Sequence, residues 1–155
     1  MPKSRGARER GSEGVGVRLD QFNRVTIMIR YHWELDVYKF SVESAMRIFE
    51  LSNQFPQGER YSLTDQIRRS SRSVSGQIGE AWRRRKYGNI FVNKLNESEG
   101  EAAETQVWLE YAVRCDYITW KDGRDLHRAY DNIIGKLVNM GNNPDSWILR
   151  KSRPT

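Results

Sequence analysis

The side chains with the clearest chemistry in this chain are seven cations on one predicted helix. If each residue turns a helix by about 100°, four of them share an arc of about 60° and a fifth lies close by. Cationic groups gathered in this way bind phosphates, and each contact strengthens binding and steepens its dependence on salt. The seven cations are Arg68, Arg69, Arg72, Arg83, Arg84, Arg85 and Lys86.

Two interpretations of these cations stay open. Arg68, Arg69 and Arg72 are expected to pair with acidic side chains of the following helix, in the same subunit or the next, in preference to phosphate. The run Arg83–Lys86 points around the whole helix, so its members cannot all reach carboxylates. For this run, binding of nucleic acid or of an acidic partner is as well supported as a solvated helix end, where positive charge suits the helix dipole.

Acidic residues of the next predicted helix also have a regular spacing. Glu97, Glu101 and Glu104 stand at i, i+4 and i+7 on one face. Such carboxylates can chelate a cation, but no histidine follows a glutamate by three residues, the pairing that metal-binding bundles use. We expect no metal and place these glutamates at an oligomer interface with Trp82 and Trp108, because tryptophan is enriched where protein surfaces meet. Base stacking on the tryptophans is the alternative.

No arrangement suited to catalysis is found. His32 and His127 are isolated, and no glycine-rich phosphate loop or dinucleotide fingerprint occurs. Cys115, the single cysteine, excludes an internal disulfide and is interpreted as a small buried packing residue. We therefore expect no catalytic residue, no cofactor and no small-molecule substrate, and predict that the protein is not an enzyme.

The overall composition predicts one cytoplasmic domain. The 155 residues carry a net charge of +6, no apolar run approaches the roughly 18–20 residues that span a bilayer, and no secretory signal is recognisable. Residues 1–33 hold seven basic and three acidic side chains, and residues 144–155 hold three and one, which leaves 34–143 neutral. Inside that neutral part, residues 60–86 are basic and 89–116 are acidic. Packing of oppositely charged helices against each other explains this pattern as well as RNA binding does.

Four amphipathic segments are predicted to be helices, over residues 36–54, 59–86, 90–114 and 123–139. Ser62 and Asp65 have the spacing of a capping box at the start of the second. Short connections between four helices predict an all-α, antiparallel, up-down-up-down four-helix bundle with a disordered N-terminal tail. The expected core consists of Val42, Ala45, Met46 and Phe49; Leu63, Ile67, Ser71, Val74, Ile78, Ala81 and Trp82; Phe91, Leu95, Ser98, Ala102, Thr105, Leu109 and Val113; and Leu126, Tyr130, Ile133, Ile134, Leu137 and Met140.

The bundle is predicted to occupy residues 34–143. Residues 1–33 contain little to bury and are expected to be disordered or poorly ordered, while residues 144–155 are expected to fray. Met28 is an alternative to Met1 as the start of translation.

Several motifs, read in order, resemble a four-helix-bundle protein family encoded by 23S rRNA intervening sequences. The resemblance covers about residues 35–141, and it departs at Gln77–Trp82, where many members read N-I-A-E-G. The segments that carry it are Leu35–Tyr38 (L-x-V-[WY]), Phe55–Arg69 (F-P-x-x-E-[RK]-[YF]-x-L-[ST]-x-Q-[IL]-R-R), Ser73–Arg85 (a Ser-x-x-x-x-Ile-x-Glu stretch and a basic run), Glu104–Gln106 and Ile133–Leu137.

The resemblance implies a small helical bundle that assembles as a ring, commonly a pentamer, with no established enzymatic activity. A distant likeness to the accessory protein of diversity-generating retroelements, a pentameric barrel that engages reverse transcriptase and nucleic acid, adds RNA or DNA as possible partners. We predict a non-enzymatic, self-associating assembly or adaptor module. The alternative is an RNA- or DNA-binding protein that uses a ring of arginine-rich second helices.

Overall fold

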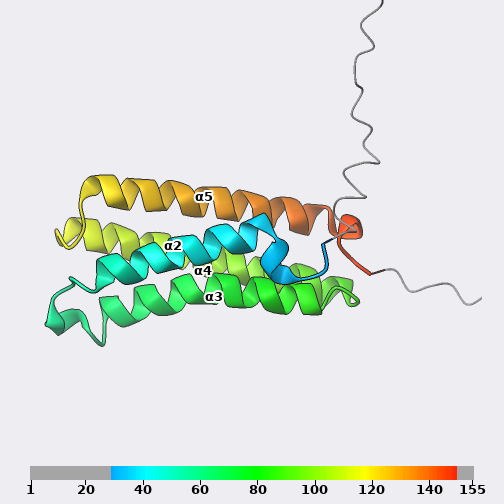
Figure 1. Cartoon of the computed structure of the whole chain (residues 1–155), viewed down its shortest axis with the longest axis horizontal. Helices are drawn as coiled ribbons and strands as arrows, with labels where there is room; N and C mark the ends of the chain where they lie inside the picture. The colour runs from blue at the N-terminus through cyan, green and yellow to red at the C-terminus, as the bar shows by residue number, and fades with distance from the viewer. Residues whose placement is uncertain (1–28, 150–155) are drawn as a thin grey trace, which may run out of the picture.

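Four antiparallel helices form the molecule, and each runs back alongside the one before it (Figure 1). The structure, a computed structural model, describes residues 29–149. The long helices are α2 (Asp36–Ser52), α3 (Leu63–Arg83), α4 (Gly88–Arg114) and α5 (Trp120–Asn142), and the short 3-10 turns are η1 (His32–Glu34), η2 (Gln57–Glu59) and η3 (Pro144–Ser146). The predicted up-down-up-down bundle is confirmed. The disorder expected for residues 1–28 and the fraying expected for 150–155 lie outside the described residues.

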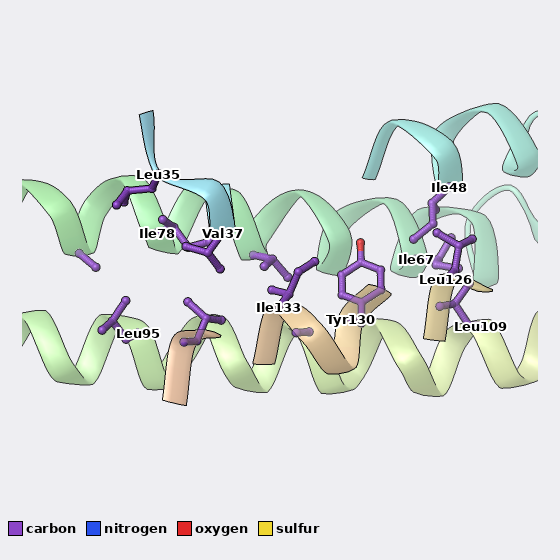
Figure 2. Packing of buried hydrophobic residues seen from close by; sticks show 14 of the residues in the cluster. Leu35, Val37, Ile48, Ile67, Ile78, Leu95, Leu109, Leu126, Tyr130 and Ile133 are labelled. Carbon is purple, nitrogen blue, oxygen red and sulfur yellow. The ribbon is translucent and has the colours of Figure 1, made fainter. Parts of the chain in front are cut away.

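The predicted core stripes of α3, α4 and α5 are largely confirmed, and their side chains fill the space between the helices (Figure 2). All seven predicted residues of α3 are buried. On α4 the stripe ends at Ala112, which is buried in place of the half-buried Val113. Of the six core residues predicted for α5, five are buried and Ile134 is half-buried. No helix in the described part of the chain is long and apolar enough to span a membrane.

The stripe predicted for α2 was wrong. Of its four residues only Ala45 is buried, and Met46 is 52% exposed. The face that meets the core instead carries Val37, Ile48 and three serines, Ser41, Ser44 and Ser52. The Ser41 hydroxyl donates to the Tyr38 carbonyl at 2.7 Å, so a polar residue is buried with its hydrogen bond made inside its own helix. Small side chains with internal partners then let α2 lie close to its neighbours.

Small hydroxyl residues also line the contact between α3 and α4. The buried Ser98 hydroxyl of α4 donates to the Val74 carbonyl of α3 at 2.8 Å. The buried Thr105 hydroxyl lies 2.9 Å from the Ser70 hydroxyl of α3. Because these side chains are short, the two backbones approach closely and the hydroxyl groups cross-link them. α3 and α4 therefore form the most extensive helix pair of the bundle.

The start of α3 is capped by a residue other than the one predicted. Ser62 occupies the cap position but its side chain bonds no backbone N–H of the helix. Glu59 does so instead, because its Oε2 accepts from the Leu63 N–H at 3.0 Å and from the Ser62 hydroxyl at 2.7 Å. These hydrogen bonds, led by the one from Ser62, hold the pKa of Glu59 below its usual value. The predicted capping box of Ser62 and Asp65 is thus replaced by a carboxylate from η2.

Both ends of the described chain pack on the bundle rather than leave it. The Arg30 carbonyl accepts a hydrogen bond from the indole N–H of Trp82 at 3.1 Å. After α5, Trp147 and Ile148 lie against the core, and the Trp147 ring meets that of Trp82 edge-on. The expected disorder is therefore wrong for residues 29–33, and the expected fraying is wrong for 144–149.

α5 lies tightly against α4 at a glycine. A Cβ added at Gly123 would collide with a methyl group of Val113, whereas one at the exposed Gly135 of the same helix would meet nothing within 4 Å. We predict that Gly123→Ala lowers the free energy of unfolding by about 1–3 kcal/mol through overpacking. Gly135→Ala is the matched control and should raise that energy by about 0.4–1 kcal/mol. Urea denaturation measures both, and equal effects would contradict the close approach.

The core tyrosine makes stability depend on alkaline pH. Burial raises the pKa of Tyr130, whose ring stands in the middle of the core with its hydroxyl directed away from α4 (Figure 2). In the unfolded chain tyrosine loses its proton near pH 10, so above that pH the unfolded state binds fewer protons and stability falls as pH rises. We expect Tyr130 to contribute a loss of up to about 1.4 kcal/mol per pH unit. Denaturation at about pH 9 and pH 11 should show this extra loss in the wild type and not in Tyr130→Phe.

Candidate functional site

Two arginines of the predicted cationic ridge lie over α2 and not over α4. The Arg68 guanidinium donates to the Ser52 hydroxyl at 2.8 Å and to the Asn53 side-chain oxygen at 3.1 Å. It also lies 4.9 Å from the centre of the Phe49 ring, and Arg72 lies 5.8 Å from the same ring. These contacts use both guanidinium groups to cover an aromatic ring. The expectation that Arg68 and Arg72 pair with acidic residues of the next helix of the same chain is therefore wrong.

Arg69 is exposed on the α4 side of α3. Within residues 29–149, no ion pair joins it to a carboxylate. Its charge nevertheless acts on Glu101. Burial raises the pKa of Glu101 and Glu104 adds to the rise, while Arg69 opposes it. Of the first three arginines, Arg69 is thus the one whose charge acts on the acidic helix, but within residues 29–149 the predicted ion pair is not formed.

The acidic residues of α4 serve different neighbours. Lys94 lies 3.0 Å from both Glu97 and Glu80, so Glu80 of α3 makes an ion pair with α4. Glu104 accepts a hydrogen bond from the indole N–H of Trp108 at 3.2 Å. Among the described residues, no three acidic, histidine or cysteine side chains are placed to hold a metal ion. The glutamates therefore form a charged flank of α4 rather than one cluster.

The basic run divides into one packed and three exposed side chains. α3 ends at Arg83, and the next residues turn toward α4. The Arg85 guanidinium lies 3.5 Å from the centre of the Trp82 ring, and its Nε donates to the Trp82 carbonyl at 2.9 Å. Burial, followed by the charge of Arg83, lowers the pKa of Arg85. Arg83, Arg84 and Lys86 are exposed and available to a partner.

Trp82 is a core residue and is used inside the protomer. Only 3% of it is exposed, because Arg85 covers its ring and Trp147 packs on its edge. This side chain offers almost no surface to a second protomer or to a base, contrary to both interpretations of it. Trp108 is half-buried and lies beside the exposed Tyr111, with their ring centres 5.9 Å apart. Of the two tryptophans, only Trp108 lies at a surface, as predicted for both.

Sequence reasoning missed two groupings of aromatic residues. Near the N-terminal end of α3, the exposed Tyr61 and Tyr111 line one hollow with the half-buried Trp108. Cys115 lines it too and is exposed, not buried as interpreted. At the opposite end of the bundle, Tyr31 and Trp33 stack with ring centres 4.3 Å apart. Periodicity assigns residues to helix faces, so it gave no signal for Tyr31 and Trp33, which precede the first long helix.

Comparison with known proteins agrees with the fold. Residues 33–139 match the model of a family described as 23S rRNA-intervening sequence protein. The chain is also similar to a crystal structure from Bacteroides thetaiotaomicron VPI-5482, described as a protein with unknown function from the S23 ribosomal protein family. The two share 30% sequence identity with a TM-score of 0.63, and the match covers 69% of this chain and 99% of that one. No curated protein matches the chain.

The packed Arg85 should contribute more to the free energy of unfolding than the exposed Arg84 beside it. Arg85→Ala removes a guanidinium stacked on a buried indole and should lower the free energy of unfolding by about 1–2 kcal/mol. Arg84→Ala is the matched control and should change it by less than about 0.5 kcal/mol, because that side chain is exposed. Thermal and urea denaturation provide the measurement. If both variants unfold alike, Arg85 is as free as Arg84 and the division of the run is wrong.

Proposed function

The chain belongs to the 23S rRNA-intervening sequence protein family, and we propose that it is a non-enzymatic helical module that works by assembling with copies of itself. The support is the surface of α4. A helix that faces water normally carries charged residues on its outer side. The outer side of α4 instead presents an uncharged stripe at alternating spacings of four and three residues. Its members are all exposed: Asn89, Asn93, Asn96, Gly100, Ala103 and Val107.

The uncharged stripe has the properties of a helix-packing face. Gly100 and Ala103 stand at its centre, and a Cβ at Gly100 would meet nothing within 4 Å. A second helix can therefore approach the α4 backbone closely at this point. The stripe continues toward the exposed Tyr111 and the half-buried Trp108, aromatic residues of the kind that anchor protein interfaces.

Charged residues beside the uncharged stripe would orient a second copy of the protein on it. Glu97, Glu101 and Glu104 flank the uncharged stripe on the α3 side of α4, as the spacing along the helix requires. Burial raises the pKa of Glu101 and the adjacent Glu104 raises it further, so a cation from a second copy would be favourable there. The outer face of α2 offers a different surface, with exposed Phe40 and Met46 among charged residues. Two unlike patches suit a heterologous contact, which closes into a ring when the rotation permits, as in the pentamer that the resemblance implies.

Substitutions on the uncharged stripe test this proposal. Asn96→Glu or Ala103→Glu would place an unpaired carboxylate inside the contact, at a cost of about 3–5 kcal/mol. Both variants should be monomers, while Asn132→Glu on the exposed side of α5 should assemble like the wild type. Light scattering after size exclusion at tens of micromolar gives the masses, and circular dichroism checks folding. A monomeric wild type, or stripe variants that assemble normally, would refute the proposal.

We propose nucleic-acid binding as the second candidate function. Its support is confined to one end of the bundle, where Arg83, Arg84 and Lys86 are exposed. The ridge of arginines along α3 supports it less than the sequence suggested, because Arg68 and Arg72 cover Phe49.

A further inference from the structure

A pocket of about 530 Å³ is lined by residues from the end of α3 and from both ends of the described chain. Figure 1 shows that these segments meet at one end of the bundle. Trp82 and Arg85 contribute to its wall from the end of α3, and Leu149 does so from the segment after η3. Among residues 29–149, four cations line it, Arg30, Arg83, Arg85 and Lys86, and no carboxylate does. The pocket is therefore an electropositive hollow with aromatic walls.

Two exposed aromatic rings stand in this pocket. Tyr31 and Trp33 are 44% and 52% exposed, and their rings are nearly parallel, with an interplanar angle of 7°. His32 between them also lines the pocket, and its half-buried ring meets the Tyr38 and Trp33 rings edge-on. Three successive aromatic or imidazole side chains, of which Tyr31 and Trp33 are the more exposed, thus line the pocket. A stack of two rings has outer faces on which a further flat ring can add.

The backbone that carries the two rings is held from both sides. Glu34 Oε2 accepts hydrogen bonds from the Arg30 N–H at 2.8 Å and the Tyr31 N–H at 2.7 Å. These bonds, led by the one from Tyr31, lower the pKa of Glu34. On the other side, the Arg30 carbonyl accepts from the Trp82 indole. The rings therefore do not need to be ordered by a ligand, which reduces the entropic cost of binding.

We propose that this pocket binds single-stranded nucleic acid. A base would extend the Tyr31–Trp33 stack, and Arg30, Arg83 and Lys86 would contact the phosphates on either side of it. Aromatic platforms combined with a cationic surface are the recognition mode of single strands, since an unpaired base exposes its flat face and a paired base does not. An acidic peptide would satisfy the cations but would leave the two flat rings without a partner. The inference rests on the second candidate function and is independent of self-association.

Fluorescence anisotropy with a labelled oligothymidine of about 12 nucleotides tests the pocket on the full chain. Trp33→Leu should raise Kd about tenfold, the loss expected for one stacked base, and Trp33→Phe should largely restore binding. Trp120→Leu is the matched control. That tryptophan is 66% exposed and also lies beside an arginine, Arg124, but at the other end of the bundle, so its loss should leave Kd unchanged.

The contribution of the pocket cations to binding is tested by a separate variant. The double variant Arg83→Gln with Lys86→Gln should weaken binding and reduce the slope of log K against log salt by about 1.4, or about 0.7 for each phosphate contact. The double variant Arg114→Gln with Lys121→Gln, at the opposite end, should not change the slope. A duplex of the same length should bind more weakly than the single strand and should be insensitive to Trp33→Leu.

The possible failures are distinguishable. If the charge variant weakens binding but Trp33→Leu and Trp120→Leu both bind like the wild type, nucleic acid is bound without stacking, and the pocket inference is wrong while the second candidate function stands. If the wild type binds neither strand nor duplex at low salt, both the pocket inference and the second candidate function are refuted. If polyglutamate displaces the strand and itself binds the wild type and Trp33→Leu equally well, the site serves an acidic protein and the inference is overturned.

Discussion

The burial of Trp82 is the interaction on which the structure of the pocket end of this molecule depends. A buried indole needs a partner for its N–H group, and here it donates to the Arg30 carbonyl, 3.1 Å away. That bond fixes the segment before α2 across the end of α3. The ring itself is covered by Arg85 and met by Trp147, which fixes the segment after α5 in the same place. One core residue therefore joins both ends of the described chain, and as a consequence it leaves Tyr31, Trp33, Arg83 and Lys86 around a common hollow.

The contact between α3 and α4 determines what the rest of the surface presents. Ser98 and Thr105 bond α3 through short hydroxyl side chains, so the helices pack closely and each turns one narrow stripe inward. A long helix with a narrow buried stripe exposes most of its circumference. On α3 much of the exposed part is charged, whereas α4 carries an uncharged stripe from Asn89 to Val107 beside its glutamate flank. A contact between the stripe and another protein would give this difference between the two helices a physical reason.

The fold could be predicted from sequence because apolar residues on α3, α4 and α5 repeat with the helical period, and burying them together leaves few arrangements of four connected helices. The core face of α2 was not predicted, because it carries Ser41, Ser44 and Ser52. The hydroxyls of Ser41 and Ser52 donate to carbonyls of their own helix, and a scale of hydrophobicity does not record such bonds. Glu59 was missed as a cap because the bond depends on how η2 folds back. The partners of the cations were predicted wrongly for another reason. Periodicity gives the direction in which a side chain leaves its helix but does not identify the group that it contacts. Arg68 reaches α2, and Arg85 folds back on Trp82, although the cations next to them in the sequence stay exposed.

Self-association and nucleic-acid binding would reinforce each other through symmetry. The uncharged stripe on α4 and the pocket at the end of α3 share no residues, so one surface can be covered while the other stays open. In any closed ring of identical copies, equivalent points lie at the same height around the axis, and the pockets would therefore form a circle on one level. A single pocket with one stacked base and a few phosphate contacts binds weakly. A strand that passes from one pocket to the next makes each later contact intramolecular, which multiplies affinity without any new kind of contact. A ring of weak sites would thus give a small pocket and a separate surface suited to assembly a common purpose.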